Sequence, residues 1–481
     1  MKANIGLSAN NVPLVSSRIL PFWVEPARVF SPMAHLPGSV LLESQPGSIG
    51  ARYSVICTEP FGTLHTICGR TFSNLPDGSS TGTESPFEKL RDVLSTRAMP
   101  PSAGARFAGG SVGYLGYELR TFVEDVPISA SDDLGLPDCW IGFYDCAAVF
   151  DHKDRTIALN ACTLHDSPDR RVGLETLEDL ILRARNEKEQ EHSSELPRPG
   201  AHTPSSSFTR AGYCAAVREV KEYIAAGHVY QVNLSQRFTA PVEMDAWDVY
   251  LRLRKHNPAP YAAYLNAGDF QVVSSSPECF LALDPASRLV TTRPIKGTRP
   301  RSADPAEDAR LASELAASAK DIAENIMIVD LERNDLGRVC EFGSVAAPDL
   351  AVIESHPTVH HLVSTITGRL RRDHDVLDLL TACFPGGSIT GAPKIRAMEI
   401  IDELETVRRG VYTGSIGYLG FDGSANLNIA IRTAVVKDGF WHLHVGGGIV
   451  ADSDPEMEYQ ETLDKGRAFF EVLGCPQTIE A

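Results

Sequence analysis

The sequence lacks the features of a membrane protein, a metal-thiolate protein or a nucleic-acid-binding protein. Its ten cysteines form no Cys-x-x-Cys pair and no cysteine–histidine cluster with zinc spacing. No apolar run approaches the length that spans a bilayer, and the first residues lack the apolar core of a signal peptide. The formal net charge of −17 disfavours nucleic acid or an anionic membrane as a bulk partner. We therefore expect a soluble, cytoplasmic protein with reduced and mostly buried cysteines.

The composition is that of a globular protein. The chain has 481 residues, 43% of them hydrophobic, which suits two or three domains or one large two-layer unit. Residues 186–207 are rich in Glu, Ser and Pro and predict a mobile linker or loop. This segment separates region 1–185, where short β-type runs alternate with Gly and Pro turns, from region 208–481.

Apolar periodicity and capping residues predict the main elements of both regions. Thr209 and the pair Asp454-Pro455 have the character of helix starts. Helices are predicted over 85–94, 173–185, 209–227 and 304–329 and after Asp454, and strands over 229–238, 359–366, 411–421 and 426–436. Residues 415–421 nearly repeat residues 111–117, which indicates either two related strand–turn units or a coincidence.

A lysine within a basic stretch is the first candidate for chemistry. Lys296 lies between a β-type run and a Gly-Thr turn, and Arg293, Arg299 and Arg301 flank it. Burial and arginine neighbours would both lower the pKa of Lys296 and favour its use as a nucleophile. The alternative is a surface turn with solvated basic side chains.

Carboxylates on two predicted helices are candidates for a cation site. Glu324 lies near the C-terminal end of its helix and gains nothing from the helix dipole there. Glu458, Glu461 and Lys465 share one face of the last helix. They form either a surface ion-pair ladder or, through Glu461 with Glu324, part of a site for a hard cation such as Mg²⁺.

Two glycine-rich segments expose backbone N–H groups. Residues 383–394 lead to Pro393 at the expected first position of a helix, where an anion can bind. The Gly-Lys-Ser/Thr ending of a Walker A loop is missing, so nucleotide binding is not expected. The second segment contains Gly446, Gly447 and Gly448.

Several motifs together resemble the chorismate-binding family, which includes anthranilate synthase component I, aminodeoxychorismate synthase component I, isochorismate synthase and salicylate synthase. The matching segments occur in the family's order and are 230–237, 274–278, 293–298, 324–335, 361–364, 387–394 and 458–462. Residues 35–185 resemble the family's N-terminal region more loosely. The resemblance implies an α+β, anthranilate-synthase-like fold, with two large antiparallel β-sheets packed together and helices outside. Region 208–481 would be the chorismate-binding catalytic domain.

Two positions separate the chemistries within this family. Isochorismate and salicylate synthases carry a water-activating lysine where this chain has Gln231, which implies ammonia as the nucleophile. Anthranilate synthases carry alanine where this chain has Lys296, so the resemblance favours the aminodeoxychorismate branch, which serves folate biosynthesis. The chain has no Gly-x-Cys-x-Gly loop, so ammonia would come from a separate glutamine amidotransferase subunit. The rival functions are anthranilate synthase component I and a catalytically inactive binding subunit.

The resemblance also implies a role for each matched residue. Lys296 would be the nucleophile, Glu278 the general acid, and His361 would lie beside the substrate ring. Mg²⁺ would bind Glu324 and Glu461, with Glu458 close by. The substrate would contact Gly297, Thr298, Thr390, Tyr412, Arg432, Gly446, Gly447, Gly448 and Lys465. A tryptophan site, either regulatory or structural, would involve Ser44, Pro260, Tyr261 and Ala262, although a plain strand and a plain turn remain the alternative there.

Overall fold

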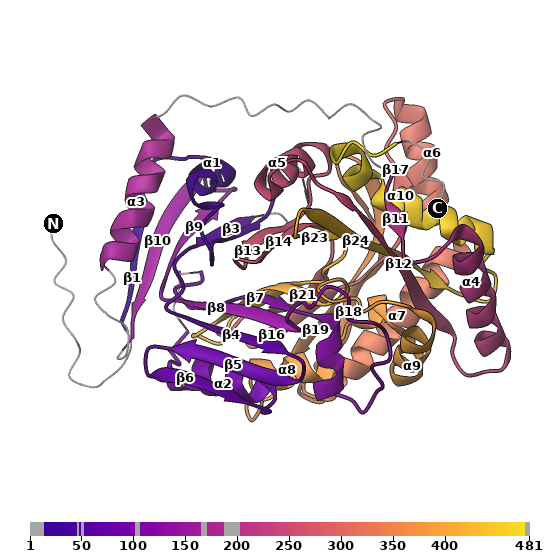
Figure 1. The fold of residues 1–481 in the computed structure, drawn as a ribbon, viewed down its shortest axis with the longest axis horizontal. Helices are drawn as coiled ribbons and strands as arrows, with labels where there is room; N and C mark the ends of the chain where they lie inside the picture. The colour runs from indigo at the N-terminus through magenta and orange to yellow at the C-terminus, as the bar shows by residue number, and fades with distance from the viewer. Residues whose placement is uncertain are drawn as a thin grey trace.

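Two antiparallel sheets form the centre of the molecule (Figure 1). The computed structural model describes residues 14–45, 48–49, 52–101, 106–164, 171–186 and 203–476. The sheets are stacked, and helices lie on their outer faces (Figure 1). The predicted α+β fold is therefore confirmed.

The first sheet contains twelve strands. Their order across the sheet is β1 (Leu14–Leu20), β10 (Thr156–Thr163), β9 (Cys146–Asp151), β3 (Tyr53–Cys57), β2 (Val40–Glu43), β13 (Tyr261–Asn266), β14 (Phe270–Ser276), β23 (Thr433–Lys437), β24 (Phe440–Ile449), β12 (Gln231–Pro241) and β11 (Ser205–Ser206), with β20 (Gly391–Ala392) also on β12.

The second sheet also contains twelve strands. Their order is β17 (Ile295–Pro300), β19 (Val359–Arg369), β16 (Leu289–Arg293), β15 (Cys279–Leu283), β22 (Ala425–Asn428), β21 (Ser415–Gly420), β7 (Gly110–Leu115), β8 (Cys139–Tyr144), β4 (Gly62–Ile67), β5 (Arg70–Leu75) and β6 (Gly78–Gly82), with β18 (Ala346–Ser355) also on β19.

The helices cover the outer faces of the two sheets. Helices α1, α3, α5 and α10 contact the first sheet, and α2, α6 and α7 contact the second. The helices are α1 (Pro26–Phe30), α2 (Pro86–Thr96), α3 (Arg171–Asn186), α4 (Arg210–Ala225), α5 (Ala246–His256), α6 (Pro305–Ala316), α7 (Ala319–Gly337), α8 (Val376–Cys383), α9 (Lys394–Leu404) and α10 (Pro455–Val472), with short 3-10 turns η1 (Ser31–Met33), η2 (Tyr117–Phe122) and η3 (Gly387–Ile389). A hydrophobic cluster that includes Val112, Val272 and Ile416 fills the space between the sheets.

Both sheets take strands from both sides of the predicted linker. In the first sheet β2 pairs with β13, and in the second β7 pairs with β21. The two regions therefore share each sheet, and their division at 186–207 remains a prediction about the sequence. Most of this segment lies outside the described residues, but Asn186 ends α3 and Ser205–Ser206 form β11.

The two similar segments noted in the sequence pair directly with each other. Strand β7 runs antiparallel to β21, and Gly113 lies opposite Gly417. A Cβ atom at Gly113 would lie 2.1 Å from the Trp140 carbonyl oxygen, and one at Gly417 would lie 2.0 Å from that of Asn426. Each glycine therefore permits a close approach of neighbouring strands.

Several predicted boundaries are wrong. The predicted helix over 304–329 is two helices, because the Ser318 side chain accepts a hydrogen bond from Asp321 N–H and caps α7 after α6 has ended. Pro393 is the N-cap residue of α9 and not its first helical residue. The strands expected over 411–421 and 426–436 are β21, β22 and β23, so Tyr412 and Arg432 lie in turns.

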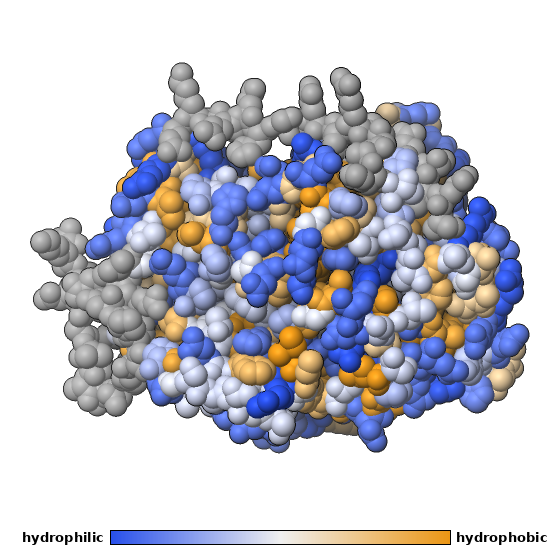
Figure 2. All heavy atoms as spheres, in the orientation of Figure 1, coloured by the Kyte–Doolittle hydropathy of each residue, from blue (hydrophilic) through white to orange (hydrophobic). Residues whose placement is uncertain are grey.

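The cysteines are mostly buried, as the sequence predicts. All ten cysteines are free, and Cys68 is the exposed one while the others are buried. On the face in Figure 2, hydrophobic residues form small groups among hydrophilic ones. No helix in the described part of the chain combines the length and the apolar character that a membrane span needs.

Candidate active site

Lys296 lies on edge strand β17 and points its amine toward the glycine-rich loop. Its Nζ donates a hydrogen bond to the Ser388 carbonyl oxygen at 3.1 Å. Burial lowers the pKa of Lys296, and the charge of Lys465 lowers it further, while Glu324 and Glu278 oppose this shift. The predicted direction of the pKa shift is therefore confirmed.

The predicted contribution of the flanking arginines is wrong, because each guanidinium is paired with a carboxylate. Arg293 pairs with Glu354. Arg299 lies 2.8 Å from Glu314, and Arg301 lies 2.8 Å from Asp308. The positive charge that lowers the pKa of Lys296 comes instead from the distant Lys465.

Glu278 lies between β14 and β15 and is only 4% exposed. Burial raises the pKa of Glu278, while Ser388 and the charge of Lys296 act in the opposite direction. Its backbone carbonyl accepts a hydrogen bond from Ile429 N–H at 3.0 Å, which holds the residue in place. A raised pKa beside a lysine with a lowered pKa places a potential acid and a potential nucleophile in one site.

His361 lies on β19, opposite Thr298 of β17. Its Nδ1 is 3.0 Å from Thr298 Oγ1. Burial and then the charge of Arg432 lower the pKa of His361 well below its usual value, so the ring is neutral. The Gly-Thr turn expected after Lys296 is wrong, because Gly297 lies at a register shift inside β17. Gly297 has a φ of 76°, and a Cβ there would lie 2.8 Å from Leu315 Cδ1, so this position requires glycine. Arg432 also has a positive φ, 49°.

The charged side chains of α10 converge on the glycine segment of β24. A Cβ at Gly447 would lie 3.2 Å from Glu458 Oε2, 3.5 Å from Glu461 Oε1 and 3.7 Å from Lys465 Nζ. Lys465 Nζ is 2.7 Å from Glu461 Oε1 and donates a hydrogen bond to the Gly446 carbonyl at 2.8 Å. The ladder predicted from spacing is therefore present, and it borders the site.

Glu324 faces these groups from α7. Burial raises the pKa of Glu324, and the charge of Glu461 also raises it. Its Oε1 atom is buried without a hydrogen-bond partner, and Lys320 Nζ lies 4.0 Å from it. Burial also raises the pKa of Glu458, and Glu461 contributes to that shift. An unpartnered carboxylate oxygen beside other carboxylates fits a cation.

This arrangement is incomplete as a metal site formed by protein alone. Among the described residues, no group of three His, Cys, Asp or Glu side chains is close enough to hold a metal ion. Mg²⁺ usually keeps one or two carboxylates and completes its shell with water and substrate oxygens. The carboxylates therefore fit an ion that shares its coordination with a bound substrate.

Sequence reasoning left some site residues without a role. Gln231 is fully buried, and neither polar atom of its amide has a hydrogen-bond partner. Asn233 Nδ2 donates to the same Ser388 carbonyl that accepts from Lys296, at 3.0 Å. Gln231 and Asn233 are two residues apart in β12, so the strand period places both amides on one face. Thr390, a predicted substrate contact, supports the loop through its hydroxyl, which donates to the Gly386 carbonyl at 3.0 Å.

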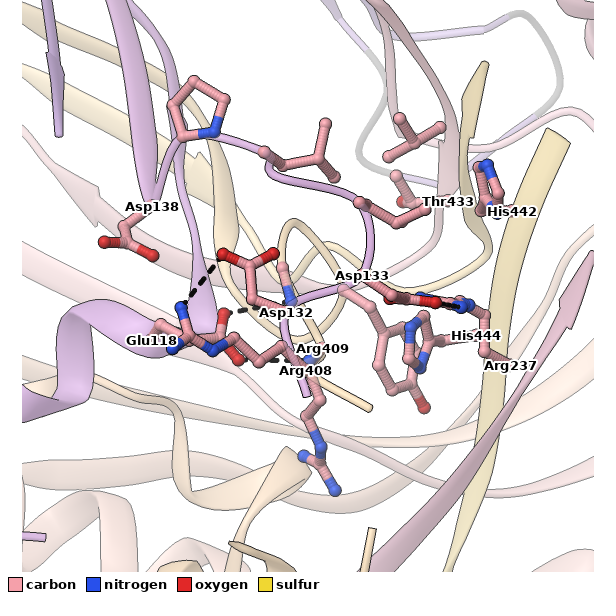
Figure 3. Close-up of a pocket in the computed structure, with 16 residues that line it drawn as sticks. Glu118, Asp132, Asp133, Asp138, Arg237, Arg408, Arg409, Thr433, His442 and His444 are labelled. Atoms are coloured by element: carbon pink, nitrogen blue, oxygen red, sulfur yellow. Dashed lines mark hydrogen bonds and ion pairs between the residues drawn. The ribbon is translucent and has the colours of Figure 1, made fainter. Parts of the chain in front are cut away.

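Tyr412 lines a separate small cavity. Its ring stacks on His444, with centroids 5.2 Å apart. Both residues line a cavity of about 30 Å³, which Arg237 and His442 border (Figure 3). Burial lowers the pKa of His442 to about 4, and Arg237 contributes. This volume holds one or two water-sized molecules and excludes a larger substrate.

The four residues of the predicted tryptophan site line one cavity. Ser44, Pro260, Tyr261 and Ala262 border a volume of about 110 Å³, and Ser44 Oγ donates to the Pro260 carbonyl at 3.1 Å. Arg52 and Arg106 also line this cavity. The two predicted walls therefore do meet, and they enclose space for a small ligand.

Comparison with known proteins identifies the family. The model of the family described as chorismate binding enzyme matches residues 39–471. This chain belongs to that family. The chain is 44% identical to aminodeoxychorismate synthase component 1 of Escherichia coli, over 91% of this chain and 93% of that protein. It is 40% identical to anthranilate synthase component 1 of Pseudomonas putida, over 98% and 97% of the two chains.

A solved structure of a relative supports the same family assignment. Anthranilate synthase component I from Streptococcus pneumoniae superimposes with a TM-score of 0.76 at 32% identity, covering 88% of this chain and 93% of that one. The paired sheets that position β17, α7 and α10 are therefore those of the chorismate-binding family.

Proposed function

We propose that this chain is aminodeoxychorismate synthase component I, which converts chorismate and ammonia to 4-amino-4-deoxychorismate. The observation that carries the proposal is Lys296, whose pKa is lowered by burial beside a buried Glu278 with a raised pKa. Relatives named aminodeoxychorismate synthase component 1 are 44% and 43% identical to this chain and support the same function.

The proposed reaction uses Lys296 as a nucleophile and Glu278 as an acid. The neutral amine attacks C2 of chorismate, the ring double bond shifts, and the C4 hydroxyl leaves with a proton from Glu278 as water. Ammonia then adds at C4 and the bond between C2 and Lys296 breaks. The proton lost by the new amine returns to the Glu278 carboxylate. Chorismate and ammonia thereby give 4-amino-4-deoxychorismate and water.

The carboxylates of α7 and α10 are proposed to hold Mg²⁺. Glu324 and Glu461 would be ligands, with Glu458 close by. Glu458 Oε1 already accepts a hydrogen bond from Ser453 Oγ at 2.6 Å. A bound Mg²⁺ would withdraw electron density through the ring carboxylate. The charges of Lys465 and Lys320 lower the pKa of Glu461, which favours its ionised form.

The remaining residues would bind and orient the substrate. Arg432 and Tyr412 would hold the enolpyruvyl group, and neutral His361 would lie beside the ring. Backbone N–H groups of Gly297 and Thr298 and of residues 446–448 would bind carboxylate oxygens. The unpartnered amide of Gln231 would face the site where water-using family members carry lysine. Ammonia would come from a separate glutamine amidotransferase subunit in the cytoplasm.

The second candidate function is anthranilate synthase component I, in which ammonia adds at C2. The 40% identity to the Pseudomonas putida enzyme over almost the whole chain favours it. The test is to incubate the protein with chorismate, Mg²⁺ and ammonium at alkaline pH and to identify the product by mass and chromatography. We expect 4-amino-4-deoxychorismate, and anthranilate as the sole product would refute the proposal. Lys296→Ala should lose most of the C4 product.

The cavity bordered by Ser44 and residues 260–262 is proposed to bind tryptophan. Its two arginines would donate hydrogen bonds to a carboxylate, and its apolar walls suit an indole ring. Titration calorimetry tests the site, and an absence of both heat and thermal stabilisation on adding tryptophan would remove it.

A further inference from the structure

The backbone carbonyl of Ser388 accepts hydrogen bonds from two side chains of the site. Lys296 Nζ donates to it at 3.1 Å, and Asn233 Nδ2 donates to it at 3.0 Å. A carbonyl oxygen has two lone pairs, so it can accept both bonds at once. Among the described residues, this carbonyl is the one group that accepts a hydrogen bond from Lys296 Nζ. The shared acceptor therefore links Asn233, which has no part in the chemistry above, to the proposed nucleophile.

Asn233 also holds the loop through its main chain. Its N–H donates to the Thr390 carbonyl at 2.8 Å, so this one residue of β12 supports two carbonyl groups of the loop. Its own carbonyl accepts a hydrogen bond from Arg409 Nη2 at 2.7 Å. Arg409 Nη1 donates to the Ile389 carbonyl, between the other two, at 3.1 Å. The successive carbonyls of residues 388–390 are therefore all fixed by Asn233 and Arg409.

The groups behind this contact are themselves well supported. Arg409 is 3% exposed, and its guanidinium pairs with Glu405 at 2.7 Å. Asn233 is half-buried inside β12, opposite Gly448 of β24, and the two residues before it pair with β20. The strand is thus held on both sides where Asn233 reaches the loop, which limits how far the Ser388 carbonyl can move.

We propose that Asn233 is a positioning residue, which fixes the Ser388 carbonyl where this acceptor orients the Lys296 amine for attack. A neutral amine has two N–H bonds and one lone pair, and an acceptor that holds one N–H restricts the direction of the lone pair. Orientation of a reacting group is a large contribution to catalysis. The inference rests on the proposed function, in which Lys296 attacks C2.

The same carbonyl also favours the charge that develops during the attack. As the bond to C2 forms, Nζ gains positive charge and keeps both of its protons until the bond to C2 breaks again. A hydrogen bond from a charged donor is stronger than one from a neutral donor, so the contact with Ser388 strengthens along the reaction. An acceptor held in place before the attack needs no rearrangement at that moment.

The test compares the wild-type protein with Asn233→Leu and Asn233→Asp. Both side chains are close to asparagine in size, and neither leucine nor an ionised aspartate can donate to the carbonyl. Each protein is mixed with chorismate and Mg²⁺ without ammonia, and the Lys296 peptide is followed for a mass increase of one chorismate less one water. We expect this adduct to form about 100-fold more slowly in both variants, the loss that a displacement of about 1 Å can cause. The KM for chorismate in steady-state assays with ammonium should stay unchanged.

The matched control is Asn266→Asp in β13, a strand of the other sheet. Asn266 is 4% exposed, and its Nδ2 donates to the Ala34 carbonyl at the same distance of 3.0 Å. This variant should lose thermal stability but form the adduct at the wild-type rate per folded protein. If Asn233 had a structural role alone, its variants would behave in the same way, and that result would overturn the proposal. A raised KM with an unchanged maximal rate of adduct formation would also overturn it, because Asn233 would then act in substrate binding.

The wild type and the variants report on different claims. If the wild type forms no adduct and yields anthranilate alone, the proposed function fails, and the role of Asn233 fails with it. If the wild type forms the adduct and both Asn233 variants form it equally fast, the inference about Asn233 fails while the proposed function stands.

Discussion

Glu278 and Asp402 are equally buried, each 4% exposed, yet their surroundings differ. Asp402 on α9 accepts hydrogen bonds from Arg120 Nη2 at 2.8 Å, Ser129 N–H at 2.8 Å and Ser129 Oγ at 2.6 Å. Glu278 has a raised pKa and neighbours a lysine whose own pKa is lowered. A carboxylate that is paired with a buried guanidinium is fixed as part of the scaffold, whereas a carboxyl group whose pKa is raised by burial can keep a proton for chemistry.

The difference concerns the carboxylates and not every polar atom, because Arg120 Nε and Nη1 beside Asp402 also lack a hydrogen-bond partner. Around Asp402, hydrogen bonds tie α9 to the segment that follows η2, and nearby Arg409 pairs with Glu405 at 2.7 Å. Around Lys296, Gln231 and Glu324 Oε1 have no hydrogen-bond partner. These unpartnered groups lower the stability of the fold, and favourable contacts elsewhere must offset that loss. They are free to bind a substrate or an ion.

The largest loss of turnover should follow from Glu278→Gln. The amide cannot donate a proton as an acid, and loss of a general acid typically costs on the order of 10²–10⁴-fold in rate. Steady-state product formation with chorismate and ammonium measures this, and Glu307→Gln, an exposed acid paired with Arg310, is the control. Wild-type kcat in the Gln variant would show that Glu278 is a scaffold residue like Asp402.

A smaller loss should follow from Glu324→Ala or Glu461→Ala. Each substitution removes a proposed Mg²⁺ ligand. Loss of a residue that only hydrogen-bonds to a metal ligand typically lowers activity roughly 10–100-fold, so loss of a ligand itself should lower turnover by more. Both proteins should keep their fold, because Glu324 is mainly unpartnered and Glu461 lies at the surface. Magnesium titration after treatment with a chelator is the measurement, and activity that withstands the chelator would contradict it.

Asp402→Asn should have the smallest effect on turnover and a clear effect on stability. It leaves the buried Arg120 guanidinium without its anionic partner, and breaking a buried pair costs about 3–5 kcal/mol in the free energy of unfolding. Thermal unfolding followed by circular dichroism measures the loss, with kcat normalised to folded protein. An unchanged midpoint would mean that the pair contributes little to the scaffold.

Local motifs predicted the site better than they predicted the elements around it. The direction of the Lys296 pKa shift followed from the sequence, because burial of a lysine always favours its neutral form. The cause of the shift did not follow from the sequence. The pairing of Arg293 with Glu354 and the effect of Lys465 depend on contacts between residues that are far apart in the chain.

The misplaced boundaries have a similar origin. Apolar residues recur at helical spacing throughout 304–329, but Ser318 caps a new helix in the middle of this segment. The strand expected over 411–421 begins only at Ser415, because Gly410 and Thr413 adopt positive φ in the turn before it.

The pairing of β7 with β21 also determines how the chain must fold. Ser111 Oγ donates to the carbonyl of Leu419, 308 residues further along the chain. Neither sheet can be completed until the C-terminal strands have been synthesised, and closing so long a loop costs chain entropy before the pairing returns any stabilisation. During synthesis the buried strand β7 has an unpaired edge, which is a template for aggregation. Because strands of both regions pair within each sheet, we expect the protein to fold slowly and to need protection of the β7 edge during synthesis.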